Sequence, residues 1–208
     1  MRAAVVGGAL ALLSASGVCG ADDPWPLLEE FRGNLSEQSP FTAEFTQSFV
    51  PEGFSTGEEE SGRLALSLPD CLRWDYYEPY PKSFILCGDV IHYWNPGEDE
   101  GHVEEVDAQR EPGLDLLLVS VSELETRYSA RVESKRGRAV EITMVPIEPN
   151  ELVAEATLRL NAQLDRLLAL RYVDPEGNRT EFRISTFKKG VTTGLFNPPE
   201  GIAWLDDW

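Results

Sequence analysis

The sequence predicts a mainly β (α+β) fold, in which many short antiparallel strands form a highly curved sheet or barrel. Three observations lead to this prediction. Segments of alternating apolar and polar residues recur along the chain, turns containing Pro and Gly separate them, and only two segments show helical character. This order of elements differs from the alternating strands and helices of a doubly wound α/β fold.

The N-terminal segment is typical of a signal peptide. Arg2 supplies a positive charge, residues 3–13 are apolar, and small residues follow, so cleavage is expected after Gly20 or Ala21. The apolar run is short for a transmembrane span. We therefore expect residues 1–20 to be removed on export.

A lipid anchor at Cys19 is the alternative to simple cleavage. It is disfavoured because Val18 occupies the position where a small residue should precede the cysteine, and no Leu lies three positions before Cys19. The expected mature chain is therefore a single exported domain over residues 21–208, long enough for a sizeable core.

The charge balance is strongly acidic, with 18 Lys and Arg against 36 Asp and Glu and a formal net charge of −18. Such a surface repels nucleic acid and anionic lipid headgroups. The composition therefore argues against nucleic acid as a partner and against electrostatic docking to a membrane.

The first predicted elements are a helix and two strands. Four apolar residues at helical spacing predict an amphipathic helix over residues 24–35. Clean alternation predicts strands over residues 41–49 and 62–68, and residues 50–61 between them read as a loop rich in Gly and Glu.

Three consecutive antiparallel strands are predicted within Leu68–Pro96. The first carries Leu72, Trp74 and Tyr76 on one face, and a turn containing two prolines follows it. The other two strands cover residues 83–87 and 90–94, with Gly88 and Asp89 as the turn between them.

A hairpin centred on Pro79 places Cys71 directly opposite Cys87 on neighbouring strands. Because export permits disulfides, we predict a Cys71–Cys87 bond that contributes roughly 3 kcal/mol in the chain-entropy description. The alternative is two buried free thiols. The same register pairs Leu72 with Leu86 and Trp74 with Phe84.

The C-terminal half is predicted to hold an acidic loop, a short helix and further strands. The loop covers residues 97–107, and an apolar run over residues 114–124 suits a short, broken helix. Strands are predicted at residues 140–145, 152–161, 167–173 and 181–187, with a turn at 174–178.

Motifs for covalent or metal chemistry are lacking in the sequence. Neither His92 nor His102 belongs to a nucleophile–His pattern, and no zinc-binding motif occurs. The acidic run at residues 98–107 lacks the spacing of an EF-hand, so we interpret it as a solvated loop and not as a calcium site. We therefore expect a protein that is not an enzyme and needs no cofactor.

Four sequence blocks occur in order along the mature chain. They are Phe41-Thr-Ala-Glu-Phe-Thr-Gln47 after the amphipathic helix, Gly62-x-Leu64 leading to Pro69-x-x-Leu72-Arg-Trp-Asp-Tyr76, Gly88-Asp-x-x-x-Tyr-Trp-Asn-Pro96, and Phe196-Asn-Pro-Pro-Glu-Gly-Ile202. In order and spacing they resemble the LolA family, the periplasmic carriers of outer-membrane lipoproteins. The resemblance covers nearly the whole mature chain.

The resemblance implies an incomplete β-barrel that short helices close as a lid. It implies a periplasmic carrier of acylated lipoproteins, loaded at an inner-membrane lipoprotein-release ABC transporter and unloaded to an outer-membrane lipoprotein receptor. We expect this carrier to be a monomer. One alternative is a LolA-like paralogue that binds or senses another envelope lipid. A hydrolase of envelope lipids or peptides is a third reading, for which the sequence offers no motif.

The resemblance also turns the apolar strand faces into a candidate lipid-binding wall, although each residue alone fits an ordinary core. A curved sheet with an apolar concave face has to be filled by side chains, by helices or by a ligand. The predicted wall and entrance comprise Phe45, Leu64, Leu66, Leu68, Leu72, Trp74, Phe84 and Leu86, and the predicted plug comprises Leu116, Leu117 and Leu118.

Leu68 is the main departure from the family pattern. The resemblance implies an arginine at this position, before the proline of the second block, that hydrogen-bonds the lid to the barrel. Arg73 lies on the opposite strand face from Trp74 and is not expected to replace it. We therefore expect a lid held mainly by apolar packing, and a change in lid opening when Leu68 is replaced by arginine.

Overall fold

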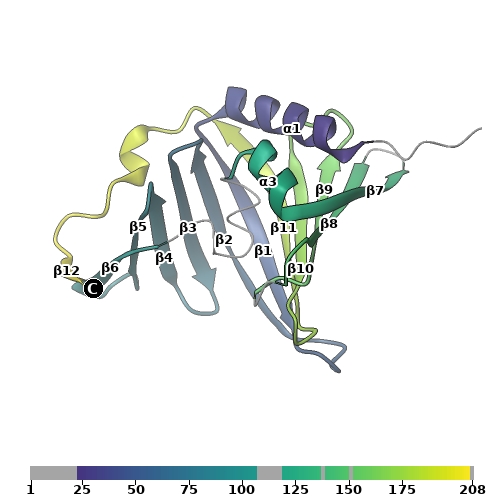
Figure 1. Ribbon diagram of the computed structural model, residues 1–208. Helices are drawn as coiled ribbons and strands as arrows, with labels where there is room; N and C mark the ends of the chain where they lie inside the picture. The colour runs from purple at the N-terminus through teal and green to yellow at the C-terminus, as the bar shows by residue number, and fades with distance from the viewer. Residues whose placement is uncertain (1–22, 107–118, 137–138, 150–151, 207–208) are drawn as a thin grey trace, which may run out of the picture.

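The computed structural model describes residues 23–106, 119–136, 139–149 and 152–206. Within these ranges the strands form one sheet in the order β12-β6-β5-β4-β3-β2-β1-β11-β10-β9-β8-β7. Neighbouring strands are antiparallel except β12 and β6. The sheet is open and strongly curved, with the helices α1 and α3 lying across its concave side (Figure 1). The predicted signal peptide, residues 1–20, lies outside the described residues and stays a prediction.

The strands vary in length from four to eleven residues, and the three longest, β1, β2 and β11, are neighbours in the middle of the sheet. They are β1 Phe41–Val50, β2 Glu58–Ser67, β3 Cys71–Glu78, β4 Lys82–Cys87, β5 Val90–Trp94, β6 Glu100–Glu105, β7 Tyr128–Arg136, β8 Ala139–Pro146, β9 Glu155–Asn161, β10 Leu167–Val173, β11 Arg179–Lys189 and β12 Ala203–Asp206.

Two α-helices and a 3₁₀-helix complete the described elements. The helix α1, Pro24–Gln38, starts at Asp23, whose carboxylate accepts a hydrogen bond from the Trp25 amide, and proline occupies its first turn. The helix α3, Val121–Arg127, is capped by Ser120. The 3₁₀-helix η1 covers Thr193–Phe196. None of the helices in these ranges has the length and hydropathy needed to cross a bilayer.

The register predicted for the central hairpin is confirmed. In the β3–β4 pair Cys71 lies opposite Cys87, Leu72 opposite Leu86 and Trp74 opposite Phe84. The two cysteines form a disulfide with their Cα atoms 4.3 Å apart. The short turn fixes this register, so the sequence was sufficient to derive it.

The predicted loop over residues 50–61 is shorter than expected, because β2 already begins at Glu58. Three other elements were missed. The predicted acidic loop over residues 97–107 contains β6, which pairs with β5 although its sequence is mostly charged. The strands β7 and β12 were not predicted at all. The strands β12 and β7 are the ends of the sheet, with one strand partner each, and β6 lies next to β12. Near a sheet end the apolar alternation of a buried strand is not required.

The main core lies between the helices and the concave face of the sheet. The helix α1 buries Leu28, Phe31 and Leu35, and Val121 and Leu124 of α3 join the same cluster. The apolar side chains of β1, β2, β3, β8, β9 and β10 supply the opposite wall. The two helices therefore occupy the hollow of the sheet and cover its apolar floor.

Candidate functional site

The candidate site is the concave face beneath α1 and α3, where most of the predicted wall residues meet. On the β3–β4 hairpin, Leu86 is buried opposite Leu72, and Phe84 is partly buried opposite Trp74. The role of these side chains in lipid binding stays a prediction. Inside the buried cluster lie Phe45, Leu64, Leu66 and Leu72, and packed against it lie Leu68 and Trp74.

The predicted plug was placed in an apolar run that follows β6. Leu116, Leu117 and Leu118 lie outside the described residues, so this part of the hypothesis stays untested. The described continuation of that run, Val119 and Val121, is buried in the core cluster against α1.

The space left between α1 and the sheet is small. A fully apolar gap of about 20 Å³ lies among side chains of α1, β1, β2 and β11, including Leu35, Phe41 and Leu66. Such a gap is close to the volume of a single water molecule. The helices therefore fill this part of the concave face with their own side chains.

A row of aromatic rings crosses the concave face farther along the strands. Neighbouring ring centroids lie 4.9–6.2 Å apart, within the range of favourable aromatic pairs. All rings except that of Phe45 are only partly buried. From β11 to β6 the row is Phe182, Phe45, Tyr76, Phe84, Tyr93 and His102.

Gly62 in β2 makes the row continuous. Phe45 and Tyr76 lie on strands to either side of β2, and their rings meet edge to face with centroids 5.0 Å apart. A Cβ at Gly62 would lie 2.9 Å from Phe45 Cζ and 2.1 Å from the Asp75 carbonyl oxygen. Only a residue without a side chain fits beneath the two rings.

Tyr76 is a polar member of this row whose hydroxyl is held in place. Its hydroxyl donates a hydrogen bond of 2.6 Å to Gln47 Oε1, and Lys82 Nζ lies 4.4 Å from its ring centroid. Burial, with a contribution from Glu60, raises the pKa of the Tyr76 hydroxyl well above its ordinary value. The phenol therefore remains a hydrogen-bond donor at physiological pH.

Part of this row could have been predicted from the sequence, and part could not. Tyr76 and Tyr93 follow from the hairpin registers that also place Trp74 and Phe84. The contact between Phe45 and Phe182 requires the pairing of β1 with β11, two strands from opposite ends of the chain. No local sequence pattern specifies that pairing.

A hydrogen bond joins α1 to the segment that leads into α3, in addition to the apolar contacts of the two helices. Arg32 on α1 donates from Nη2 to the carbonyl oxygen of Val119, two residues before α3, over 2.7 Å. Burial lowers the pKa of the Arg32 guanidinium, and the nearby charge of Glu29 partly opposes this shift. The Val119 carbonyl oxygen replaces part of the hydration that the guanidinium loses on burial. Sequence analysis did not identify this arginine because the two partners lie 87 residues apart.

Leu68 and Arg73 occupy the positions predicted for them. The side chain of Leu68 packs against the core, and its amide donates to Ser39 Oγ at the end of α1 over 2.7 Å. Arg73 lies on the opposite face of the sheet, where it pairs with Asp75 and stacks over Trp94. Arg73 therefore does not reach the lid.

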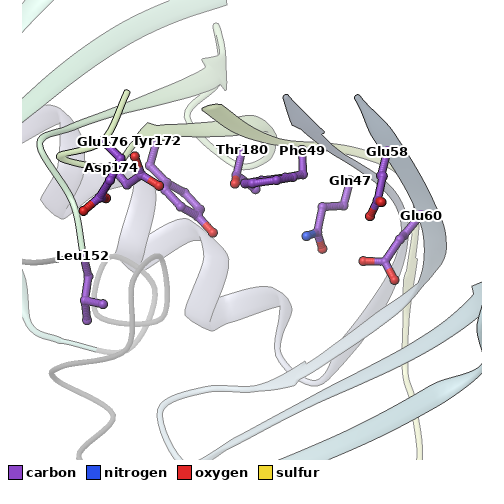
Figure 2. Close-up of a pocket in the computed structure, with 9 residues that line it drawn as sticks. All are labelled: Gln47, Phe49, Glu58, Glu60, Leu152, Tyr172, Asp174, Glu176 and Thr180. Carbon is purple, nitrogen blue, oxygen red and sulfur yellow. The ribbon is translucent and has the colours of Figure 1, made fainter. Parts of the chain in front are cut away.

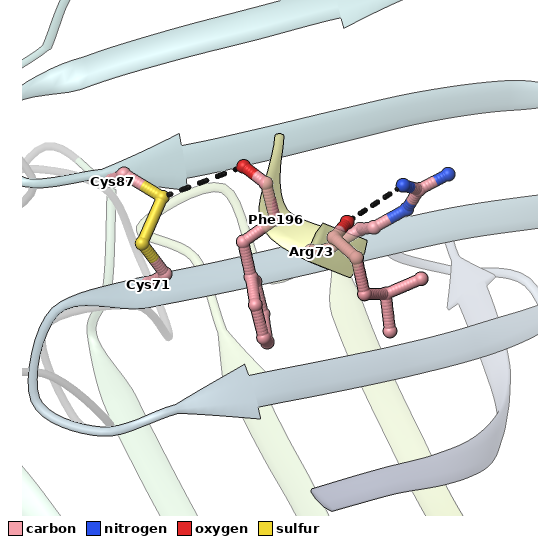
Figure 3. The surroundings of a disulfide bond; sticks show 5 residues. Cys71, Arg73, Cys87 and Phe196 are labelled. Atoms are coloured by element: carbon pink, nitrogen blue, oxygen red, sulfur yellow. Dashed lines mark hydrogen bonds between the residues drawn. A yellow bond between two sulfur atoms is a disulfide. The ribbon is translucent and has the colours of Figure 1, made fainter. Parts of the chain in front are cut away.

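The face opposite the lid is covered by the C-terminal segment. Arg73 Nη1 donates to the carbonyl oxygen of Leu195 over 2.8 Å, and Phe196 is buried beside the disulfide (Figure 3). The Cys87 sulfur lies 4.0 Å from the Phe196 carbonyl oxygen; because this sulfur is in the disulfide, it carries no proton to donate. Farther on, Trp204 of β12 packs on Trp94.

The arrangement is suited to binding apolar groups. Among the described residues, no group of three or more His, Cys, Asp or Glu side chains is placed to hold a metal ion. The chemistry available at the concave face is therefore aliphatic and aromatic contact, with few hydrogen-bonding groups.

Comparison with known sequences agrees with this picture. A sequence model of the family described as "Outer membrane lipoprotein carrier protein LolA" matches residues 36–198. An outer-membrane lipoprotein carrier protein of Chromohalobacter salexigens is 29% identical over 155 residues, which cover 73% of this chain and 71% of that protein. One from Xanthomonas campestris is 22% identical over 190 residues, covering 85% and 90%.

Solved structures share the fold at low sequence identity. An uncharacterised conserved protein from Thermus thermophilus aligns with a TM-score of 0.60 at 13% identity and covers 88% of this chain and 98% of that chain. MucB aligns with a TM-score of 0.55 at 13% identity and covers 91% of this chain and 68% of that chain. At such identities the likeness concerns the fold alone.

Proposed function

The chain belongs to the LolA family of outer membrane lipoprotein carrier proteins, and from this premise we propose that it carries lipoproteins across the periplasm. In this proposal the concave face of the sheet binds the acyl chains at the N-terminus of the cargo. The observation that carries the proposal is the extended apolar floor beneath two small helices. No step of covalent chemistry is involved.

The energetics of acyl burial suit a carrier. Burying one chain of about a dozen methylenes contributes on the order of 10 kcal/mol at ~0.8 kcal/mol per CH₂. That free energy is ample for capture in water, but it would hinder release. A carrier therefore needs an empty state whose internal contacts compete with the cargo.

The lid helices provide this competition. In the structure Leu28, Phe31 and Leu35 of α1 are buried on the floor that an acyl chain would contact, and the apolar gap beside Leu35 has a volume of only about 20 Å³. Binding then requires α1 and α3 to move away and exchange their apolar contacts for those of the cargo. Release is the reverse exchange.

We propose that loading occurs at an inner-membrane lipoprotein-release ABC transporter and unloading at an outer-membrane lipoprotein receptor. Each would act on the balance between lid contacts and cargo contacts, since a partner shifts that balance only by binding one state more tightly. The carrier itself would function as a monomer in the periplasm.

The test is to identify what the protein binds in its native compartment. The full chain is produced in a Gram-negative host, purified from the periplasm without detergent, and its bound molecules are identified by mass spectrometry. Acylated lipoproteins are expected with the native protein. The variant Phe84→Glu, which places a charge on the concave face, should lose them.

Tyr77→Glu is the matched control, because Tyr77 is 46% exposed and lies on the opposite face of the neighbouring strand. This variant should retain the cargo. Equal amounts of lipoprotein on the native protein and on Phe84→Glu would reject the proposed site. Recovery of free phospholipid or glycolipid alone would instead favour a LolA-like paralogue that binds or senses another envelope lipid.

A further inference from the structure

The concave face changes from apolar to polar along the length of β1 and β2. From the α1 end the paired residues are Phe41 with Leu66, Ala43 with Leu64, Phe45 with Gly62, Gln47 with Glu60 and Phe49 with Glu58. Each step of two residues advances about 7 Å along a strand. Beyond Phe45 the continuous apolar floor ends, and the same face carries Gln47, Glu60 and Glu58 together with Phe49.

A cavity of about 410 Å³ opens at this polar end, between β1, β2, β10 and the turn before β11. Its walls are of two kinds. Tyr172 and Phe49 form aromatic surfaces in the middle, with Glu58 and Glu60 on one side and Asp174 and Glu176 on the other (Figure 2). The cavity thus combines ring faces with carboxylates on two opposing walls.

Most carboxylates that line this cavity have no positively charged partner among the described residues. Lys82 Nζ lies 2.7 Å from Glu60 Oε1. Among the described residues no ion pair is found for Glu58, Asp174 or Glu176. Asp174 does accept hydrogen bonds from Asn178, which orders the turn.

The size and distribution of the lining suit an extended occupant better than a single small cation. The described carboxylates are not grouped closely enough to hold a metal ion. A cavity of 410 Å³ accommodates a few amino-acid residues, and long cationic side chains can place their methylenes on aromatic rings while their charges reach the carboxylates.

We propose that this cavity binds a basic peptide segment of the cargo that directly follows its acylated residue. The inference rests on the proposed lipoprotein-carrier function, because the cavity continues the face that would hold the acyl chains. An occupant anchored by its acyl chains beneath the lid would have its first peptide residues at the polar end. The carrier would then prefer lipoproteins with lysine or arginine in that segment.

The experiment compares two synthetic lipopeptides, palmitoylated on an N-terminal Cys-Ser and continuing with four lysines or four glutamates. Each is titrated into the full mature protein below its micelle concentration, by calorimetry at low salt. The lysine lipopeptide should bind on the order of tenfold more tightly, and the preference should shrink at about 0.5 M salt.

Two double variants locate the preference. Glu58→Gln with Glu176→Gln removes two cavity carboxylates and should reduce the lysine preference several-fold, while the affinity for the glutamate lipopeptide is maintained or rises. Glu59→Gln with Glu148→Gln is the control, since Glu59 is exposed on the other face of β2 and Glu148 is exposed elsewhere. This control should retain the preference.

The outcomes separate this inference from the function on which it rests. If neither lipopeptide binds the native protein, the carrier function fails and the inference fails with it. If both bind with equal affinity, or if the two double variants change the preference equally, the carrier function stands and the cavity is not a site for basic segments.

Discussion

Individual residues on the concave face are constrained by their neighbours across several strands. Gly62 lies where β2 shifts its register against β3, and the rings of Phe45 and Tyr76 meet above it. The backbone of Asp75 approaches from the adjacent strand. The absence of a side chain at one residue therefore keeps the aromatic row continuous.

Gly62→Ala should destabilise the protein. The added methyl group would lie 2.1 Å from a backbone oxygen that cannot move away without breaking strand pairing. We expect a loss of about 1–3 kcal/mol in the free energy of unfolding, measured by urea denaturation. Near-ultraviolet circular dichroism should also change as the rings separate.

Gly33→Ala is the control for this substitution. Gly33 is exposed within α1, and a Cβ there would have no neighbour within 4 Å. Alanine should stabilise the helix by about 1 kcal/mol. Two glycine substitutions with the same sign would contradict the steric account of Gly62.

Among the elements, the β3–β4 hairpin links the two faces of the sheet. Its inner face supplies Leu72 and Leu86 to the region beneath the lid, and its outer face holds the disulfide and the buried Phe196 of the C-terminal segment. The disulfide therefore supports both the sheet and the segment that covers it (Figure 3).

Removal of the disulfide should destabilise the sheet and loosen the C-terminal segment that covers it. Closing the chain between Cys71 and Cys87, 16 residues apart, contributes roughly 3 kcal/mol to stability. Cys71→Ser with Cys87→Ser should lose about that amount in chemical denaturation and expose the C-terminal segment to limited proteolysis.

Chemical reduction of the native protein provides an independent comparison. It should reproduce the stability and the cleavage pattern of the double serine variant. Thiol titration of the denatured, unreduced mature chain is expected to find no free thiol. Two titratable thiols would show that the bond does not form in the exported protein.

For the molecule as a whole, the proposed carrier function depends on how firmly α1 and α3 are held against the sheet. Packing of α1 and α3 on the floor is supplemented by the Arg32 hydrogen bond to Val119, while Leu68 contributes apolar contact. Apolar contacts are less directional than hydrogen bonds, so they can be exchanged for an acyl chain more readily.

Substitutions at these two residues should shift lipid affinity in opposite directions. Arg32→Met removes a hydrogen bond from a charged donor, so the dissociation constant for a fluorescent fatty-acid probe should fall about tenfold. Leu68→Arg introduces a donor beside the lid and should raise that constant or slow uptake.

Arg159→Met serves as the control, because Arg159 is an exposed side chain of β9 that, among the described residues, forms a long ion pair with Glu141. Its affinity for the probe should equal that of the native protein. If Leu68→Arg leaves uptake and lid opening unchanged, the interpretation of Leu68 as the family departure that alters the lid loses its support.

The sequence alone determined the features that depend on neighbouring strands. The Cys71–Cys87 disulfide and the pairing of Trp74 with Phe84 follow from one short turn, because a tight hairpin leaves a single register that keeps apolar residues on one face. The family blocks added the curved sheet and its lid, since they extend over most of the chain.

Only the tertiary structure decided which distant segments meet. The pairing of β1 with β11 brings Phe182 to Phe45, the packing of α1 brings Arg32 to Val119, and the return of the C-terminus places β12 parallel to β6. These contacts close long loops, and local alternation or helical spacing carries no information about the partner of a distant segment. The acidic cavity, and the extension of the aromatic row from Tyr76 to Phe45 and Phe182, were therefore visible only in the folded chain.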